Sequence, residues 1–150
     1  PATRAQVERA AARGLIEPLV VGHRDGAEVV GFAAGRLLRA GRWPALVAPT
    51  ERVAGGSEAV VAGLRRAALA AMSRARPGGL ALIGGETAYH VLEGLGHPTL
   101  WLESRLCPLV VRSRLMSGPY AGLAVITKGG SAGASDLLGA IVRQLGHGVR

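Results

Sequence analysis

Hydrophobic positions recur with two different spacings along the chain. Short apolar runs between glycine or proline predict strands, and apolar residues that repeat every three or four positions predict helices. The clearest strand is 80–83, Leu-Ala-Leu-Ile with glycines on both sides, which is typical of a strand buried on both faces of a sheet. Pro18 indicates an edge strand, because proline cannot donate a hydrogen bond to a sheet. The predicted strands are 15–21, 45–48, 80–83, 99–102, 108–112 and 122–127, and the predicted helices are 3–13, 26–40, 57–76, 87–95 and a last helix that is capped by Ser135 or Asp136 and ends at Gly146.

The order of these elements predicts the fold class. Strands alternate with helices, which indicates an α/β layered, Rossmann-like domain with a mostly parallel or mixed central sheet flanked by helices. The length of 150 residues suits a single domain over 1–150, without an internal repeat or linker. The chain opens with a helix and without Met, whereas doubly wound domains commonly open with a strand. We therefore expect a C-terminal fragment of a longer protein, with the first strand and a further domain upstream.

Charge narrows the possible partners. The chain carries 18 basic and 10 acidic residues, a net charge of +8, and all but one of the basic residues are arginine. The arginines are scattered at helix-like positions, and the aromatic residues are too few for a base-stacking platform. We expect an Arg-rich solvated surface and no nucleic-acid partner, with a polyanion binder as a less favoured alternative. The single cysteine excludes a cystine scaffold, and the lack of a long apolar run predicts a cytoplasmic chain with no membrane partner.

The first candidate site is a glycine-rich junction between a predicted strand and a predicted helix. Strand 80–83 runs into Gly84, Gly85, Glu86 and Thr87. Glycines let backbone N–H groups approach a ligand closely, and a helix N-terminus presents free donors with partial positive charge. The pattern fits a phosphate cradle in which Glu86 and Thr87 bind a ribose hydroxyl, a metal-bound water or a phosphate. Alternatively, Glu86 only complements the helix dipole and Thr87 only caps the helix.

A second junction of the same type follows strand 122–127. Lys128, the one lysine of the chain, stands at the strand end, and Gly129, Gly130 and Gly133 follow it closely. Such a run can form an anion-binding nest of backbone N–H groups. Both junctions lie at the carboxyl ends of strands, where α/β sheets bind ligands. The alternative is an ordinary loop with a Ser or Asp cap on the next helix.

Other familiar sites are absent from the sequence. It contains no G-x-x-x-x-G-K-[ST], G-x-G-x-x-G or G-x-S-x-G motif. Its histidines have no ligand spacing with Cys107, so no metal site is predicted. His90 follows Glu86 by one helical turn, which predicts an exposed contact or, alternatively, a pair that tunes a proton. Trp43 and Trp101 are interpreted as core or interface anchors.

Three segments, in order, resemble a known family. The run Gly84-Gly85-Glu86-Thr87-Ala88, followed by a helix and Leu95-Gly96, is similar to the GG-acid-T segment of the four-carbon acid sugar kinases. Residues 127–133, followed by Asp136-Leu137-Leu138, resemble the K-x-G-x-F-G loop of that family. The opening Thr3-Arg4-Ala5-Gln6-Val7 resembles its Thr-x-x-Gln-Val helix. The resemblance covers nearly the whole chain and concerns only the C-terminal nucleotide-binding domain of these enzymes.

The resemblance implies a part in ATP-dependent phosphoryl transfer. These enzymes phosphorylate four-carbon sugar acids such as threonate, erythronate or their 3-oxo forms. Their C-terminal domain holds ATP with Mg²⁺, and an N-terminal domain holds the sugar acid and the catalytic base. The residues implied to bind the nucleotide are Gly84, Gly85, Glu86, Thr87, Lys128, Gly129, Gly130 and Gly133, with Lys128 either near the phosphates or bracing the loop. The chain alone is then expected to be inactive, and a homo-oligomer is compatible with the sequence.

Departures from the family pattern keep a second interpretation open. Ala132 stands where the family has an aromatic residue, and the Pro-Gly turn expected after the strand of Glu103 is not preserved around 106–108. The family's Gly-Ser loop would lie upstream of Pro1. These departures are compatible with a non-catalytic nucleotide-sensing or assembly module derived from the same domain.

Overall fold

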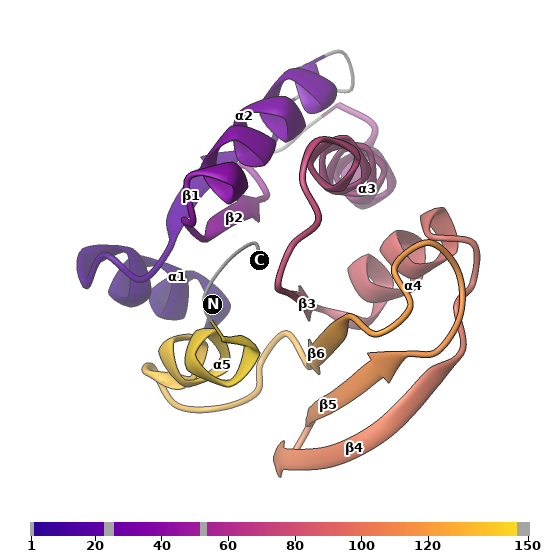
Figure 1. The fold of residues 1–150 in the computed structure, drawn as a ribbon. Helices are drawn as coiled ribbons and strands as arrows, with labels where there is room; N and C mark the ends of the chain where they lie inside the picture. Colours follow the sequence, from indigo (N-terminus) through magenta and orange to yellow (C-terminus); the bar gives the residue numbers. More distant parts are fainter. Residues whose placement is uncertain (1, 23–25, 52–53, 147–150) are drawn as a thin grey trace.

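The computed structural model describes residues 2–22, 26–51 and 54–146 (Figure 1). Each predicted helix and strand is present in these ranges, and several of their ends are shifted. The helices are α1 (Ala2–Ala12), α2 (Ala27–Arg39), α3 (Gly56–Arg74), α4 (Gly85–Gly94) and α5 (Leu137–Leu145). The strands are β1 (Glu17–Val20), β2 (Pro44–Val47), β3 (Gly79–Ile83), β4 (Leu100–Cys107), β5 (Val110–Leu115) and β6 (Ala124–Lys128). None of the helices within the described ranges is long and apolar enough to cross a membrane.

The strands form two sheets. In the larger sheet, β3, β6, β5 and β4 lie side by side in that order, with β3 parallel to β6 and the other neighbours antiparallel. In the smaller sheet, β1 runs parallel to β2. The α/β class and the mixed sheet are confirmed, but the strands do not join into one central sheet. Side chains of Ile16, Ala45 and Ile83 meet in one apolar cluster, so packing connects the two sheets.

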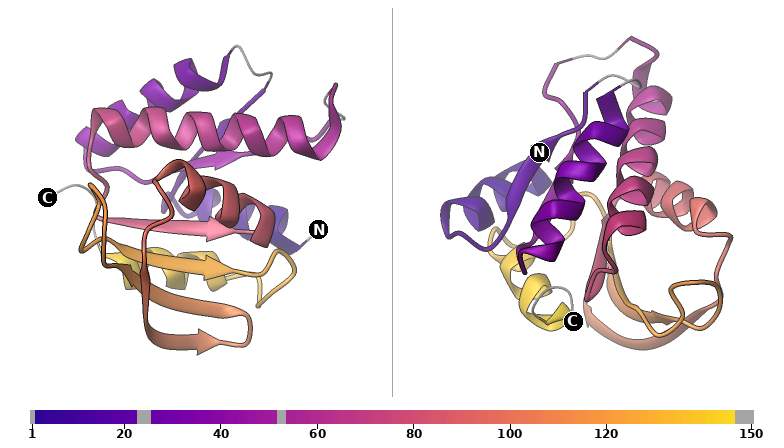
Figure 2. Two further views of the ribbon diagram at one scale, coloured as in Figure 1. Left: turned by 90° about the vertical axis from the view of Figure 1, so that its right-hand side faces the viewer. Right: turned by 45° about the horizontal axis from the view of Figure 1, so that its top comes forward.

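Helices cover both faces of the larger sheet (Figures 1 and 2). Val125 of β6 packs in one apolar cluster with Val91 of α4, while the next residue, Ile126, packs with Ile141 of α5. Successive side chains of a strand point to opposite faces of a sheet, so β6 is buried on both faces. Because β3 and β6 are parallel, their carboxyl ends lie at the same edge of the sheet. After these ends the chain continues to a helix, α4 after β3 and α5 after β6.

The helix pair α2 and α3 packs closely above the smaller sheet (Figure 2). A β-carbon at Gly31 would lie 2.4 Å from the carbonyl oxygen of Ala67, and one at Gly35 would lie 2.7 Å from Cβ of Arg74. These two glycines lower the helix propensity of α2, but they allow the two helix backbones to approach each other. The close approach explains why glycine stands inside a helix.

Two prolines, Pro108 and Pro18, lie where the strands end or lack a further partner. Pro108 and Leu109 form the turn between β4 and β5, although the sequence placed 108–112 in one strand. Leu109 has a φ of 61°, in the left-handed region that turns use. Pro18 lies in β1, which pairs with β2 alone among the described strands, so the prediction of an edge strand is confirmed.

Candidate functional site

The two glycine-rich junctions lie next to each other in space. Ile83 and Lys128 are register partners at the ends of the parallel strands β3 and β6. One residue further on, the N–H of Gly84 donates a 2.9 Å hydrogen bond to the carbonyl oxygen of Lys128. The two segments that the sequence singled out begin 44 positions apart, at Gly84 and Lys128, and form one continuous edge at the carboxyl ends of adjacent strands.

The first junction leaves open space at the start of α4. Gly84 is the N-cap residue and has a φ of 92°, a conformation that favours glycine. A β-carbon at Gly85 would meet no atom within 4 Å, and Gly85 and Glu86 are both exposed. The first N–H groups of a helix have no partner within the helix, and no side chain caps α4. The amides of residues 85–87 are thus available to a ligand.

The polar side chains of this junction take different positions from those the sequence suggested. α4 begins at Gly85, two residues earlier than predicted, so Thr87 lies in the first turn and does not cap the helix. Glu86 also lies in the first turn, where a carboxylate complements the helix dipole. The ion pair found for His90 is with Glu93: its Nδ1 lies 3.4 Å from the Glu93 carboxylate, which Arg65 also contacts at 2.7 Å.

Lys128 is buried beneath the second junction. Only 3% of the residue is exposed, and its Nζ donates to the carbonyl oxygens of Gly129 at 2.9 Å and Gly130 at 3.4 Å. Nζ also lies 3.4 Å from the hydroxyl of Thr3. Burial lowers the pKa of Lys128, and the neighbouring Cys107 opposes this shift. The sequence left two roles open for Lys128, a position near the phosphates or a brace for the loop. These contacts fit the brace.

The first helix holds the same loop from a second side. Gln6 is 1% exposed, and its Nε2 lies 3.1, 3.0 and 2.9 Å from the carbonyl oxygens of Ala132, Gly133 and Ala134. Thr3 donates its hydroxyl hydrogen to the carbonyl of Gly130. Thr3 and Gln6 lie one helical turn apart, so both reach the loop from one face of α1. Both residues belong to the Thr-x-x-Gln-Val motif of the sequence, but the motif alone did not identify them as site residues.

These contacts fix the direction of the loop amides. In a trans peptide, the carbonyl of one residue and the N–H of the next point in opposite directions. The carbonyls of residues 129, 130, 132, 133 and 134 are turned toward Lys128, Thr3 or Gln6. The N–H group of residue 130 therefore faces away from Lys128, and those of residues 131, 133, 134 and 135 face away from α1. None of the five donates a hydrogen bond to a backbone acceptor within the described ranges.

The glycines of the loop differ in what they tolerate. Gly133 has a φ of 83°, and a β-carbon there would lie 2.1 Å from Cδ2 of Leu137, so the position requires glycine. A β-carbon at Gly129 would lie 3.3 Å from Cβ of Leu109. One at Gly130 would meet no atom within 4 Å. Gly133 shapes the loop, whereas Gly130 leaves room in front of it. Ala132, where the related family has an aromatic residue, is buried in the core.

A cavity of about 440 Å³ adjoins this loop. Its walls come from the end of β4, from the loop and from the first turns of α5. The lining residues are Cys107, Pro108, Gly133, Ala134, Asp136, Leu137 and Ala140. The lining is mostly apolar with the carboxylate of Asp136 at one side, and the cavity is a hollow that is open to solvent.

Other candidates from the sequence lie elsewhere. Trp43 packs in the core between the sheets, whereas Trp101 on β4 is 65% exposed. In the part of the chain that the structure describes, no three His, Cys, Asp or Glu side chains gather where they could hold a metal ion. His23 and His147 lie outside the described residues.

Comparisons with known proteins agree with this architecture. Residues 1–138 match the family described as the nucleotide-binding C-terminal domain. A Bordetella bronchiseptica protein described as a domain of unknown function (DUF1537), a domain-swapped dimer with bound citrate, has a TM-score of 0.77 at 23% identity, over 96% of this chain and 38% of its own. A second crystal form of that protein gives a TM-score of 0.69 at 25% identity, over 96% and 36%.

A third solved structure, from Salmonella typhimurium LT2, has a TM-score of 0.69 at 16% identity, over 95% of this chain and 37% of its own, and shows the fold alone. The comparison with curated proteins finds no match. The chain thus spans well under half the length of the solved proteins that it resembles. It belongs to the family of nucleotide-binding C-terminal domains, which confirms the resemblance to the C-terminal domain of the four-carbon acid sugar kinases.

Proposed function

We propose that this chain binds ATP through its phosphates at the two adjacent glycine-rich junctions. The proposal rests on the backbone N–H groups of residues 130, 131, 133, 134 and 135. These groups have no backbone acceptor among the described residues and face away from the side chains that hold the loop. The free amides at the start of α4 continue this array, because Gly84 and Lys128 join the two junctions. Backbone N–H groups at helix N-termini and in glycine-rich loops commonly bind phosphate oxygens.

In this proposal, Lys128 acts on the phosphates through the loop. Its ammonium group already contacts two loop carbonyls and Thr3, so the donors presented to ATP are neutral amides. The residues proposed to line the phosphates with free amides are Gly85, Glu86, Thr87, Gly130 and Gly133. Gly84 and Gly129, whose N–H groups donate to Lys128 and Leu109, are proposed to bring the two junctions close to the phosphates, and Lys128 holds the second junction in place. The net charge of +8 would attract an anionic nucleotide at long range.

Magnesium enters this proposal as part of the MgATP substrate. The described residues offer no preformed cluster of metal ligands, and Mg²⁺ in phosphoryl-transfer sites is held largely by phosphates and water with one or two carboxylates. Glu86, exposed beside the first junction, is the carboxylate placed to approach it. The adjoining cavity of about 440 Å³ would take the nucleoside, with apolar walls for the base and Asp136 for a hydroxyl or amino group.

We further propose that the chain is the nucleotide-binding part of a kinase for four-carbon sugar acids. The support is the resemblance in three motifs and the length of the solved relatives, which leaves room for a substrate domain. A sugar-acid hydroxyl oxygen would attack the γ-phosphorus, the bond from that phosphorus to the leaving oxygen of ADP would break, and a base on the other domain would take the proton. The 150-residue chain alone would bind ATP without turnover.

Calorimetry with MgATP tests the binding proposal. Gly85→Val and Gly130→Val combined should abolish binding and leave the fold intact, because a β-carbon at either position meets no neighbouring atom. Ala12→Val, at an exposed end of α1, is the control and should bind ATP like the wild type. A wild-type chain that is folded by circular dichroism and shows no heat of binding would contradict the proposal.

A non-catalytic module is the second candidate, and Ala132 favours it. The related kinases carry an aromatic residue at this position of the loop, and here a small buried residue replaces it. A nucleotide sensor would keep ATP binding in the longer polypeptide but would not convert threonate or erythronate to a phosphate ester. Because the Bordetella relative is a domain-swapped dimer, we also propose that this chain self-associates. A kinase assay on the longer polypeptide separates the two candidates.

A further inference from the structure

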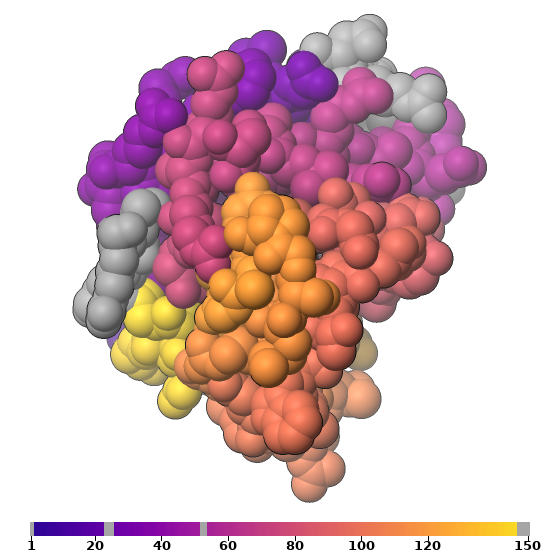
Figure 3. Space-filling model, turned by 45° about the vertical axis from the view of Figure 1, so that its right-hand side comes forward, coloured from indigo at the N-terminus to yellow at the C-terminus, as the bar shows by residue number. Residues whose placement is uncertain are grey.

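Three arginines gather where the C-terminal ends of two helices lie side by side. Arg36 and Arg39 belong to the last turn of α2, and Arg74 belongs to the last turn of α3. Together with Phe32 they line a hollow of about 230 Å³, which we call the arginine hollow. All three arginines are exposed, and no Asp or Glu of the described ranges lines the hollow. Figure 3 shows α2 (violet) against α3 (magenta to rose) at the surface of the molecule.

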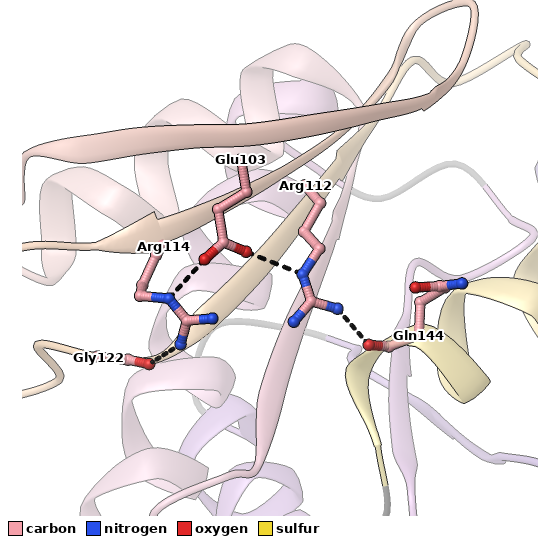
Figure 4. A network of polar contacts seen from close by, with 5 residues as sticks. All are labelled: Glu103, Arg112, Arg114, Gly122 and Gln144. Atoms are coloured by element: carbon pink, nitrogen blue, oxygen red, sulfur yellow. Dashed lines mark hydrogen bonds and ion pairs between the residues drawn. The ribbon is translucent and has the colours of Figure 1, made fainter.

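Several arginines elsewhere in the described ranges have a carboxylate partner. Arg112 and Arg114 share the carboxylate of Glu103, at 2.9 and 2.6 Å (Figure 4). Two further pairs are Arg42 with Glu17 and Arg65 with Glu93. The arginines of the hollow differ from these, because the groups that they contact in the described structure are neutral.

Neutral groups hold two of the three guanidinium groups in place. Arg39 donates from Nε and Nη2 to the carbonyl oxygen of Arg74, at 3.0 and 2.7 Å. The guanidinium of Arg74 lies over the ring of Phe32, 4.1 Å from its centroid. The side chain of Arg36 lines the hollow and makes no hydrogen bond or ion pair with the described residues. A guanidinium has five N–H donors, so Arg39 keeps three for a ligand and Arg36 keeps all five.

The helix ends offset only part of this positive charge. Cations are favourable at a helix C-terminus, because the last carbonyls together carry about half a negative charge. Two helix ends therefore supply about one negative charge against three positive charges. The remainder of about two positive charges is unfavourable at short separation, since like charges repel. A ligand with two negative charges would neutralise it.

We propose that the arginine hollow binds a phosphate group of a small molecule. A phosphate monoester carries a charge of about −1.5 to −2 at pH 7, which matches the remaining positive charge. Its oxygens also match the paired N–H groups of a guanidinium, so Arg36 and Arg39 can each form a bidentate contact. The hollow limits the ligand to a compact anion, whereas a nucleic-acid strand requires a basic groove with stacking residues along its length.

The arginine hollow is separate from the two glycine-rich junctions. α2 ends at Arg39, shortly before β2 begins at Pro44, and α3 ends at Arg74, shortly before β3 begins at Gly79. The hollow therefore lies toward the amino ends of these strands, whereas the junctions lie at the carboxyl ends of β3 and β6. The inference is independent of ATP binding, and a ligand here would not occupy the place proposed for ATP.

Calorimetry with inorganic pyrophosphate at constant ionic strength tests the site. The background is the double variant Gly85→Val and Gly130→Val, which should not bind phosphate at the junctions. In this background one pyrophosphate should bind per chain, and Arg36→Gln should weaken binding by about tenfold or more through the loss of charge-assisted hydrogen bonds. Arg9→Gln is the matched control, since it removes one charge from an exposed residue in the last turn of α1. No heat of binding in the background, or equal affinities of the two arginine variants, overturns the proposal.

NMR of the backbone amides locates the anion in the wild-type chain. Pyrophosphate should shift the amide signals of residues 36–40 and 74–76, and chloride at the same ionic strength should not. Shifts at 85–87 and 130–135 report binding at the junctions, so the two proposals succeed or fail separately. Pyrophosphate shifts that are confined to the junctions, or spread equally over all exposed arginines, overturn the proposal. A single-stranded oligonucleotide that shifts residues 36–40 at lower concentration than pyrophosphate would overturn the assignment to a small molecule.

Discussion

The side chain of Gln6 donates a 2.9 Å hydrogen bond to the carbonyl of Ala134, across 128 positions of the sequence. The same amide nitrogen lies near the carbonyls of the two preceding residues, and Gln6 is almost fully buried. One side chain of the first helix therefore sets the direction of three peptide groups in the glycine-rich loop. This contact connects the N-terminal motif of the chain to the second of the two junctions.

Gln6→Leu should lower both stability and nucleotide affinity. The leucine fills a similar volume but leaves three carbonyls without their buried donor, which should reduce the free energy of unfolding by about 1–3 kcal/mol. The loop amides also lose their fixed direction, so ATP affinity should fall further than stability alone explains. Urea unfolding and calorimetry measure the two effects. Gln144→Leu, exposed on α5, is the control, and equal losses in both variants would contradict the role given to Gln6.

The sequence predicted the elements and the position of the junctions because both depend on local signals. A run such as 80–83 between glycines identifies a buried strand, and glycines after a strand identify a sharp exit into a loop or helix. The hairpin turn was misplaced because an apolar residue, Leu109, takes the left-handed conformation that the pattern gives to glycine. Whether the residues at the junctions bind a nucleotide stays a prediction.

The remaining features depend on contacts between distant segments. Nothing near Gln6 in the sequence identifies the three carbonyls that it contacts, since they are 126–128 positions away. The division into two sheets is set by which strands pair, and Ile16 and Ile83 meet only after the chain has folded. The burial of Lys128 was missed for the same reason, because a lysine at a strand end is normally solvated.

Gly133→Ala should destabilise the chain, whereas Gly130→Ala should not. Alanine at 133 must adopt a φ near 83° and place its β-carbon 2.1 Å from Leu137, while the same methyl group at 130 meets open space. Left-handed backbone strain alone is about 1–2 kcal/mol, and the contact with Leu137 adds to it. Thermal unfolding of both variants measures the difference. Similar midpoints for the two would show that the loop does not have this conformation.

Lys128 should titrate below the ordinary pKa of a lysine. Burial lowers its pKa, against the smaller opposing effect of Cys107, so the folded chain releases this proton at lower pH than the unfolded chain. Between the lowered pKa and the ordinary lysine pKa of about 10.4, the unfolded state holds more protons, and the free energy of unfolding should rise with pH. Lys128→Met should remove this rise. Because the chain has one lysine, selective labelling gives a single side-chain NMR signal that reports its pKa directly.

Glu103 should stabilise the hairpin above about pH 4.3 and lose that contribution in acid. Hydrogen bonds from Arg112 and then Arg114 lower its pKa, so the folded state holds the carboxylate at a pH where the unfolded state is already protonated. As the pH falls through the lowered pKa, the stabilisation disappears. Glu103→Gln should remove this pH dependence from hydrogen exchange of the β4 and β5 amides, and Glu8→Gln, exposed on α1, should leave it unchanged.

Ala140→Leu should separate recognition of the nucleoside from recognition of the phosphates. Ala140 lines the cavity beside the loop but contributes no amide to the array at 130–135, so the larger side chain occupies space proposed for the base. Affinity for MgATP should fall by about tenfold or more, because a few misplaced carbon atoms in an apolar pocket change binding by about that factor. Affinity for inorganic tripolyphosphate, measured by the same calorimetry, should stay at the wild-type value. Equal losses for both ligands would place the phosphates in the cavity instead, and no loss for either would exclude the cavity from the nucleotide site.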